Sequence, residues 1–190
     1  INFFDNLDGG AAGTVAISAI FLTYLSLSNG QSFIAALAVV VTGGTLGFLI
    51  WNRTPARIYM GDAGALFLGV LLATLTIRLN PDTQTLFASF AIPILLLATP
   101  ILDTCVAVFS RLRRGISPFQ GGKDHLSHRL IRLGFSRKLA AISLWMLSAF
   151  FGLLAVIVSS VSEQYEVNLV MLSILFWLLL FIGFFRTADQ

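Results

Sequence analysis

Residues 32–51 read SFIAALAVVVTGGTLGFLIW and contain no charged side chain. A helix needs about 20 consecutive, predominantly apolar residues to cross the hydrocarbon core of a bilayer. This stretch has both the length and the composition. It therefore predicts a transmembrane helix.

Similar apolar stretches occur on both sides of residues 32–51. The chain has 190 residues, of which 57% are hydrophobic and 11% are charged, whereas a soluble domain contains about 25% charged residues. A soluble globular domain is thereby excluded. We expect six stretches to span the membrane: 11–28, 32–51, 64–80, 86–109, 138–160 and 167–185. The predicted fold class is all-α, a polytopic transmembrane helical bundle that forms one domain, or part of one, over 1–190.

The basic residues predict the orientation of this bundle. With six alternating spans, segments 1–10, 52–63 and 110–137 and the C-terminus lie on one side, together with eleven of the twelve Lys and Arg residues. Only Arg78 falls on the other side. Because cytoplasmic loops carry the excess of Lys and Arg, we expect these segments to be cytoplasmic. The net charge of +3 thus reflects topology, and nucleic acid is not an expected partner.

The segment before the first predicted span contains a polar cluster of Asn2, Asp5, Asn6 and Asp8. If the segment is helical, Asn2, Asp5 and Asn6 share one face. Carboxylates held close together raise each other's pKa unless a cation or a hydrogen-bond donor compensates. Two interpretations stay open: a ligand-binding face, or a helix N-cap with solvated acids at the membrane surface.

The link between the second and third spans, residues 52–64, contains the second cluster. Gly61 and Gly64 leave the backbone accessible around one carboxylate, that of Asp62. Such a loop can expose N–H groups to a phosphate while Asp62 holds a metal. Mg²⁺ prefers one or two protein carboxylates, with water and phosphate oxygens as its other ligands. An ordinary tight turn between two spans is the alternative.

Asp103 lies about two turns inside the predicted cytoplasmic end of span 86–109. The same span contains Pro93 and Pro100, which loosen a helix and free carbonyl groups for a cavity or for polar neighbours. A charge buried there should face a functional site or pair with a base such as Arg57 or Arg111. The sequence leaves both alternatives open.

Both histidines of the chain, His125 and His128, follow Asp124 in the long segment between the fourth and fifth spans. In a helix the two histidines share a face, while Leu126 and Leu130 would lie on the bilayer. Zinc needs a third and a fourth ligand at similar spacing, and the segment offers none. A phosphate or diphosphate site built from His, Lys and Arg fits better. The alternative is a polybasic loop that rests on anionic lipid.

All four features fall on the predicted cytoplasmic face of the bundle. Together they favour metal-assisted chemistry on a phosphorylated substrate at the membrane interface. A polytopic transporter is the alternative function. Transporters, however, place their sites near the membrane midplane between repeats, and no internal repeat is evident in this chain.

The same residues form four landmarks in a fixed order. They are Asn2-Phe-Phe-Asp5-Asn6-Leu-Asp8-Gly9, then Asn52 to Gly64 with Pro55-Ala56 and Met60-Gly61-Asp62-Ala-Gly64, then Pro100-Ile-Leu-Asp103-Thr104 leading to Arg111, and finally Gly-Ile-Ser-Pro-Phe119 followed by His125-Leu-Ser-His128-Arg129-Leu130. In this order they resemble the polyprenyl-phosphate N-acetylhexosamine-1-phosphate transferases, the family of the MraY, WecA and TagO types.

This resemblance implies an integral membrane enzyme of ten or eleven helices. Such an enzyme transfers a sugar-1-phosphate from a UDP-sugar to a polyprenyl phosphate, here undecaprenyl phosphate, releases UMP and needs Mg²⁺. It would initiate cell-wall or surface polysaccharide synthesis in the bacterial plasma membrane, with its active site on the cytoplasmic face. The 190 residues would be the C-terminal portion, about half of the catalytic domain.

The resemblance also implies roles for individual residues. Asp62 corresponds to the family's magnesium ligand. The catalytic set would be Asp5, Asp62, His125 and His128. The substrate-binding set would be Asn2, Asp8, Gly61, Arg129 and Asp103.

Three departures from the family pattern qualify these implications. The adjacent Asp-Asp pair of the family is absent from this chain, and Ser127 stands where many members have a further His. The acidic residue that often lies three positions before the first histidine is also missing, so the acid nearest to His125 is the adjacent Asp124. We therefore expect the 190 residues alone to be inactive, and a non-catalytic fragment is a further alternative. The lack of a triple-His run favours N-acetylglucosamine over a muramoyl-pentapeptide donor. The sequence leaves a homodimer open.

Overall fold

The computed structural model describes residues 1–83 and 85–187. The elements are η1 (Asn2–Phe4), α1 (Gly10–Ser28), α2 (Ser32–Asn52), α3 (Gly61–Arg78), α4 (Leu86–Leu96), α5 (Ala98–Arg113), α6 (Leu126–Arg132), α7 (Arg137–Ser160) and α8 (Glu163–Arg186).

The helices confirm an all-α membrane protein. Within the described residues, α1, α2, α3, α7 and α8 are each long and apolar enough to cross a membrane, and α4 with α5 forms a sixth candidate. The predicted span over 86–109 is present as a bent pair of helices, because α4 and α5 meet at 73° around Leu97.

Proline accounts for this bend. Pro100 has no N–H to donate to the Leu96 carbonyl four residues earlier, so the helical ladder is interrupted there. The Ser18 hydroxyl of α1 donates to this freed carbonyl at 2.8 Å, and Trp177 Nε1 of α8 donates to the Ala98 carbonyl at 3.1 Å. Neighbouring helices thus supply donors that lipid cannot.

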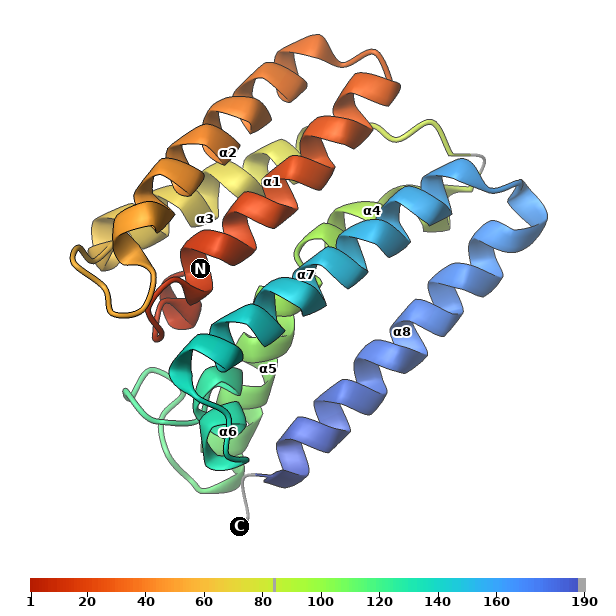
Figure 1. Ribbon diagram of the computed structural model, residues 1–190. Coiled ribbons are helices and arrows are strands. Elements are labelled where there is room, and N and C mark those ends of the chain that lie inside the picture. The colour runs from red at the N-terminus through yellow and green to blue at the C-terminus, as the bar shows by residue number, and fades with distance from the viewer. Residues whose placement is uncertain (84, 188–190) are drawn as a thin grey trace.

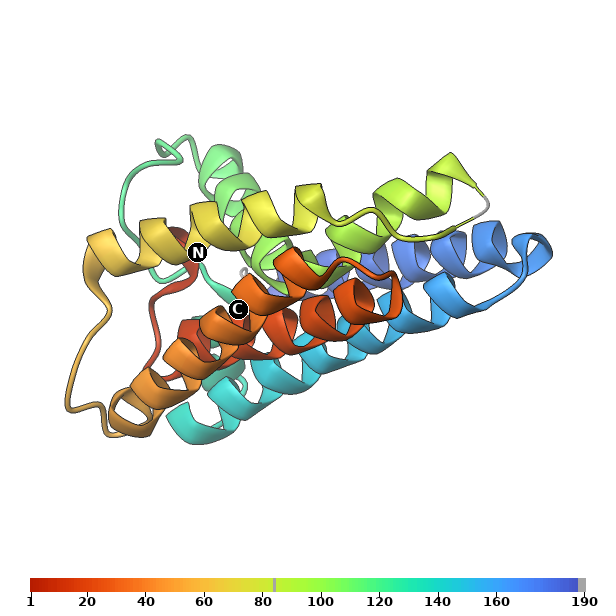
Figure 2. The ribbon, with the colours of Figure 1, turned by 90° about the horizontal axis from the view of Figure 1, so that it is seen from above.

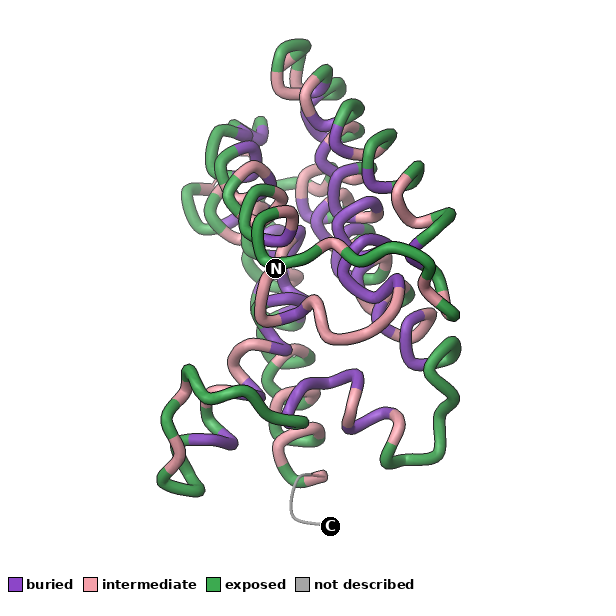
Figure 3. Tube along the Cα trace, turned by 90° about the vertical axis from the view of Figure 1, so that its left-hand side faces the viewer, coloured by how far each residue is buried: buried purple, intermediate pink, exposed green. Residues whose placement is uncertain are grey.

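The helices form two layers around α1. In Figure 1, α1 lies between α2 and α7 and packs against both. The view from above shows α3, α4 and α5 on the other side of this layer (Figure 2). Of the candidate spans, α1 is 67% buried but α8 only 11%. The outer helix faces are therefore exposed along most of the bundle (Figure 3).

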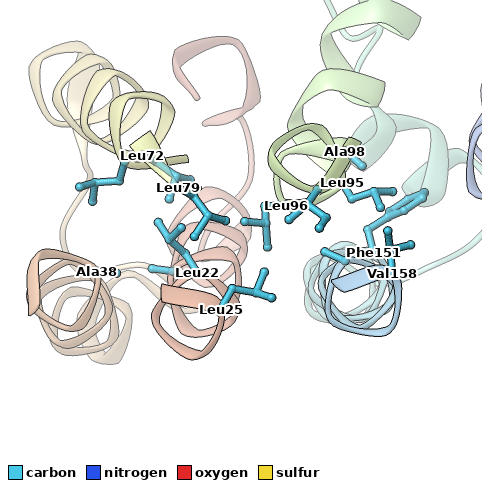
Figure 4. Packing of buried hydrophobic residues seen from close by; sticks show 14 of the residues in the cluster. Leu22, Leu25, Ala38, Leu72, Leu79, Leu95, Leu96, Ala98, Phe151 and Val158 are labelled. Atoms are coloured by element: carbon cyan, nitrogen blue, oxygen red, sulfur yellow. The ribbon is translucent and has the colours of Figure 1, made fainter. Parts of the chain in front are cut away.

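The main apolar core joins the two layers. Leu22 of α1, Leu72 of α3 and Phe151 of α7 are almost completely buried in one cluster, and Leu96 of α4 lies between the neighbouring groups (Figure 4). In a bilayer, close packing rather than water exclusion stabilises such helix contacts.

The polar links gather at one end of the bundle, which we call the site end. Segments 1–9, 53–60 and 114–136 lie there, at the lower left of Figure 1, while the links that follow α1, α3 and α7 lie at the opposite end. The alternation that the sequence predicted is therefore present. It brings the motif-bearing segments together.

Gly13 determines how closely α7 approaches α1. A Cβ atom at this position would lie 2.1 Å from Trp145 Nε1, so any side chain must push the helices apart. We expect Gly13→Leu to destabilise the protein by about 1–3 kcal/mol, the usual cost of overpacking. Thermal unfolding in detergent measures this change. Gly43→Leu on α2 is the matched control, because a Cβ at Gly43 meets nothing within 4 Å; equal melting temperatures for the two variants would contradict this account.

Candidate functional site

The centre of the site end is the buried carboxylate of Asp103 on α5. Its side chain is 0% exposed. Oδ1 accepts the Leu126 backbone N–H at 2.7 Å, and Oδ2 lies 2.7 Å from Nδ1 of His125. Asp103 therefore caps the N-terminus of α6 from another helix, where a negative charge is favoured. Of the two alternatives left open for Asp103, direct pairing with Arg57 or Arg111 is not the one present, because His125 and the Leu126 N–H are its partners.

The partners of His125 define its tautomer. Its Nε2 lies 3.1 Å from Nη2 of Arg111, and a guanidinium can only donate. Nε2 therefore accepts, and Nδ1 carries the proton that it donates to Asp103. His125 is buried with both ring nitrogens occupied. The ring is thus held in place and has no free nitrogen for a substrate.

Arg111 connects this unit to the rest of the loop. The side chain of Arg111 is 2% exposed, and its Nε donates to Asp124 at 3.1 Å; Nη1 donates to the Pro118 carbonyl at 2.7 Å. Arg114 forms a second ion pair with Asp124. Burial alone raises the pKa of Asp124, but the hydrogen bonds and charges of Arg111 and Arg114 outweigh burial and hold the pKa below its usual value.

Hydrogen bonds also join the N-terminal segment to the two other polar segments. Asp8 Oδ2 accepts the Ala56 N–H at 3.1 Å, and Asn52 Oδ1 accepts the Gly9 N–H at 3.0 Å. The Ser127 hydroxyl donates to Asn6 Oδ1. Three stretches far apart in the sequence therefore form one polar assembly.

This assembly encloses a cavity of about 690 Å³. Its basic lining residues are Arg111, Arg114, Lys123, Arg132, Arg137 and His128, and its carboxylates are Asp8 and Asp124. Positive charge exceeds negative charge, so the cavity favours an anion. Clustered Arg and Lys donors bind phosphate oxygens through short, charge-assisted hydrogen bonds.

His128 differs from His125 in facing this cavity. The two rings lie 6.4 Å apart. Burial, and then the positive charges of Arg132 and Lys123, lower the pKa of His128 below its ordinary value. At neutral pH its imidazole is therefore uncharged, with a nitrogen able to accept a proton.

Asp5 and Asp62 form a pair of carboxylates at the site end, separate from the lining of the basic cavity. Burial, and then the negative charge of Asp62, raise the pKa of Asp5. Within the described part of the chain, no group of three His, Cys, Asp or Glu residues is placed to hold a metal. Two carboxylates that repel each other in this way nevertheless fit Mg²⁺, provided that water and phosphate oxygens complete its shell.

The other predicted site residues lie around these features. Gly61 begins α3 with φ of +66°, a conformation that Gly adopts without strain. Asn2 lines a separate, largely apolar cavity beside α3 and α5. Arg129 is buried and donates to the carbonyls of Asp124 and Phe184, so it joins α6 to the end of α8.

Two local expectations are corrected by the fold. The residues before α1 form only the short η1, so Asn2, Asp5 and Asn6 do not share a continuous helical face. Leu126 and Leu130 do not rest on the bilayer, since both pack inward in a second core cluster with Phe4. The reason is the same in both cases, because hydrogen bonds to distant parts of the chain determine the conformation of the N-terminal segment and the position of α6.

Several residues of the site were not identified as site residues from the sequence. Arg114, Arg132 and Arg137 line the cavity, but in the sequence they are indistinguishable from bases that mark topology. Trp145 donates from Nε1 to the Gly9 carbonyl at 3.0 Å and so anchors the first motif. Trp145 lies 136 residues after Gly9, so no local sequence pattern indicates that the two residues are in contact.

Asp103→Asn should loosen α6. The substitution replaces one acceptor oxygen by an NH₂ group, so either His125 or the Leu126 N–H loses its acceptor. A buried donor without a partner costs about 1–3 kcal/mol. Trypsin cleavage after the buried Arg129 should therefore become roughly 5- to 150-fold faster in the detergent-solubilised full-length protein, since cleavage follows the open population. Asp82→Asn, at an exposed carboxylate of the opposite end, is the control; unchanged cleavage in Asp103→Asn would contradict the capping role.

Comparison with known proteins adds an independent observation. The family model described as Glycosyl transferase family 4 matches residues 1–80. The chain is 35% identical over 176 residues to a probable undecaprenyl-phosphate N-acetylglucosaminyl 1-phosphate transferase of Bacillus subtilis (strain 168), covering 93% of this chain and 49% of that protein. It is also 35% identical to a decaprenyl-phosphate N-acetylglucosaminephosphotransferase of Mycolicibacterium smegmatis, covering 80% of this chain and 42% of that protein.

A further relative names a different sugar donor. A phospho-N-acetylmuramoyl-pentapeptide-transferase of Streptococcus agalactiae is 28% identical over 162 residues, which cover 85% of this chain and 48% of that protein. The chain spans about half the length of the curated relatives it matches. The family match and these relatives together show that the chain belongs to glycosyl transferase family 4, the polyprenyl-phosphate N-acetylhexosamine-1-phosphate transferases.

Proposed function

We propose that the full-length protein transfers N-acetylglucosamine-1-phosphate from its UDP-sugar to a polyprenyl phosphate such as undecaprenyl phosphate, with release of UMP. The observation that carries the proposal is the basic cavity that His128, Arg114 and Lys123 share with the Asn6–Asp8 motif. The names of the relatives at 35% identity support N-acetylglucosamine as the sugar. The step would initiate cell-wall or surface polysaccharide synthesis.

The chemistry asks for positioning and charge stabilisation more than for covalent catalysis by the protein. An oxygen of the lipid phosphate forms a bond to the β-phosphorus of the UDP-sugar. The bond from this phosphorus to the bridging oxygen breaks, and that oxygen leaves with UMP. Arg114, Lys123 and Arg132 at the cavity wall would stabilise the charge that develops on the phosphoryl oxygens.

We assign separate roles to the two histidines. His128 faces the cavity as a neutral base, and we propose it as a catalytic residue. His125, with both nitrogens engaged, acts as a positioning residue together with Asp103 and Arg111. Arg129 holds α6 against α8, so its effect on substrate would be indirect.

Asp62 and Asp5 are the residues that would hold Mg²⁺. The ion, when bound, supplies positive charge to the diphosphate and so weakens the bond to the leaving group. Asp8 lines the cavity, and Gly61 gives the Asp62 turn its conformation; Asn2 lies near the same segment. We place this site end on the cytoplasmic face of the bacterial plasma membrane, because it carries eleven of the twelve basic residues.

Asp62→Asn should strongly reduce magnesium-dependent turnover. Loss of one anionic ligand should lower kcat/KM for UMP release at least about 100-fold, and the remaining rate should need more Mg²⁺. The assay uses the full-length protein with UDP-N-acetylglucosamine and undecaprenyl phosphate. Removal of Mg²⁺ by a chelator should stop the wild-type reaction. Asp82→Asn serves as the matched control, and normal Mg²⁺-dependent turnover by Asp62→Asn would overturn the ligand assignment.

The pH dependence of kcat/KM should report His128. Since the pKa of His128 is lowered below its ordinary value, the neutral form is present at pH 7, and protonation removes it as the pH falls. The rate should therefore be level near neutrality and decrease only in the acidic range, below the pH at which an ordinary histidine titrates. His128→Gln should lower kcat/KM roughly 100- to 10,000-fold, the range for loss of an acid–base group, and should remove this acidic decrease. The same decrease in the variant would assign it to another group.

A further inference from the structure

A second cavity, of about 930 Å³, lies at the site end between α2 and α7. We call it the α2–α7 groove. Its walls are largely apolar, with Leu46 and Ile50 from α2 and Ile142 and Trp145 from α7. Leu46 and Ile50 are exposed, at 44% and 61%. The groove is therefore open to the side in the described part of the chain.

The floor of the groove is fixed by hydrogen bonds. The Trp145 indole donates to the Gly9 carbonyl at 3.0 Å, and the Gly9 N–H donates to Asn52 at 3.0 Å. The helix α1 lies between α2 and α7 and packs against both (Figure 1). A ligand would thus meet a formed surface.

The rim of the groove is positively charged. Arg53, Arg57 and Lys138 line it, and Arg57 lies over the Trp51 ring, with Cζ 5.7 Å from the centroid. Asp8 is the carboxylate among the described lining residues, and it already accepts the Ala56 N–H. Three cations against one carboxylate leave an excess of positive charge beside an apolar channel.

We infer that the α2–α7 groove binds an anionic phospholipid. The phosphate of the headgroup lies between Arg53 and Lys138, and an acyl chain follows Leu46, Ile50 and Ile142. Basic pockets between transmembrane helices bind such headgroups. Tryptophan side chains such as Trp51 are characteristic of the headgroup level.

A membrane phospholipid suits the groove better than the lipid acceptor of the proposed reaction. The acceptor phosphate must reach the bases of the first cavity, Arg114, Lys123 and His128. None of these lines the groove, and Asp8 is shared by the described linings of the two cavities. The groove is therefore a neighbouring site, and lipid binding there does not depend on turnover.

Native mass spectrometry of the detergent-solubilised full-length protein tests this inference. The protein is titrated with an equimolar mixture of dioleoyl phosphatidylglycerol and dioleoyl phosphatidylcholine. We expect phosphatidylglycerol to bind first. Each basic residue near an anionic headgroup contributes about a fivefold preference. The double variant Arg53→Gln/Lys138→Gln should therefore show a preference for phosphatidylglycerol that is roughly 25-fold weaker than that of the wild type. The charge-matched control, Arg78→Gln/Arg186→Gln, should keep the wild-type preference.

A second pair of variants tests the apolar channel separately from the charge. Gly47 lines the groove, and a Cβ there meets nothing within 4 Å, so the larger side chain of Gly47→Phe starts from an open point of the channel wall. Gly43→Phe, one turn away and equally open, is the control. We expect Gly47→Phe to weaken phosphatidylglycerol binding at least about tenfold, and Gly43→Phe to leave it unchanged.

Three results would overturn the inference. The wild-type protein could bind both phospholipids equally or not at all. The variants Arg53→Gln/Lys138→Gln and Gly47→Phe could bind phosphatidylglycerol as their controls do. Added polyprenyl phosphate could displace phosphatidylglycerol, which would assign the groove to the acceptor.

Discussion

A carboxylate without water must find donors, and Asp103 is buried completely within α5. Leaving it unpaired would cost more than most single contacts contribute. The donors come from His125 and from the first backbone N–H of α6. This one requirement positions the loop between α5 and α7: α6 begins where Asp103 can cap it, and His125 must turn inward. Arg111 and Asp124 then follow, because the outer nitrogen of His125 also needs a donor.

The site end is consequently a connected assembly. The loop reaches the N-terminal segment through Ser127 and Asn6, and that segment reaches the α2–α3 link through Asp8 and Gly9. One side of Asp8 faces the basic cavity, and the other faces the α2–α7 groove. The site and the helices support each other, since the same hydrogen bonds that satisfy buried backbone also place the charged side chains.

The bilayer imposes a second constraint, which explains the bend between α4 and α5. Proline leaves a carbonyl that water cannot satisfy at membrane depth, and Ser18 and Trp177 donate to the carbonyls of this region. The sequence indicated both prolines and the freed carbonyls, but not the break at Leu97. The size of a proline bend depends on which neighbours can reach the freed groups, and those neighbours lie on α1 and α8.

The sequence by itself determined the membrane class, the apolar spans, the alternation of polar links and the ordered motifs, because hydropathy and spacing are local properties of the chain. Only the tertiary structure decided that His125 is engaged by Asp103 and Arg111 while His128 faces a cavity. It also decided that Arg114, Arg132 and Arg137 line the same cavity. Two histidines three residues apart look equivalent in sequence. The buried carboxylate of Asp103, 22 residues away from His125, distinguishes them. This carboxylate needs hydrogen-bond donors, and of the two histidines helix packing brings only His125 close enough to donate to it.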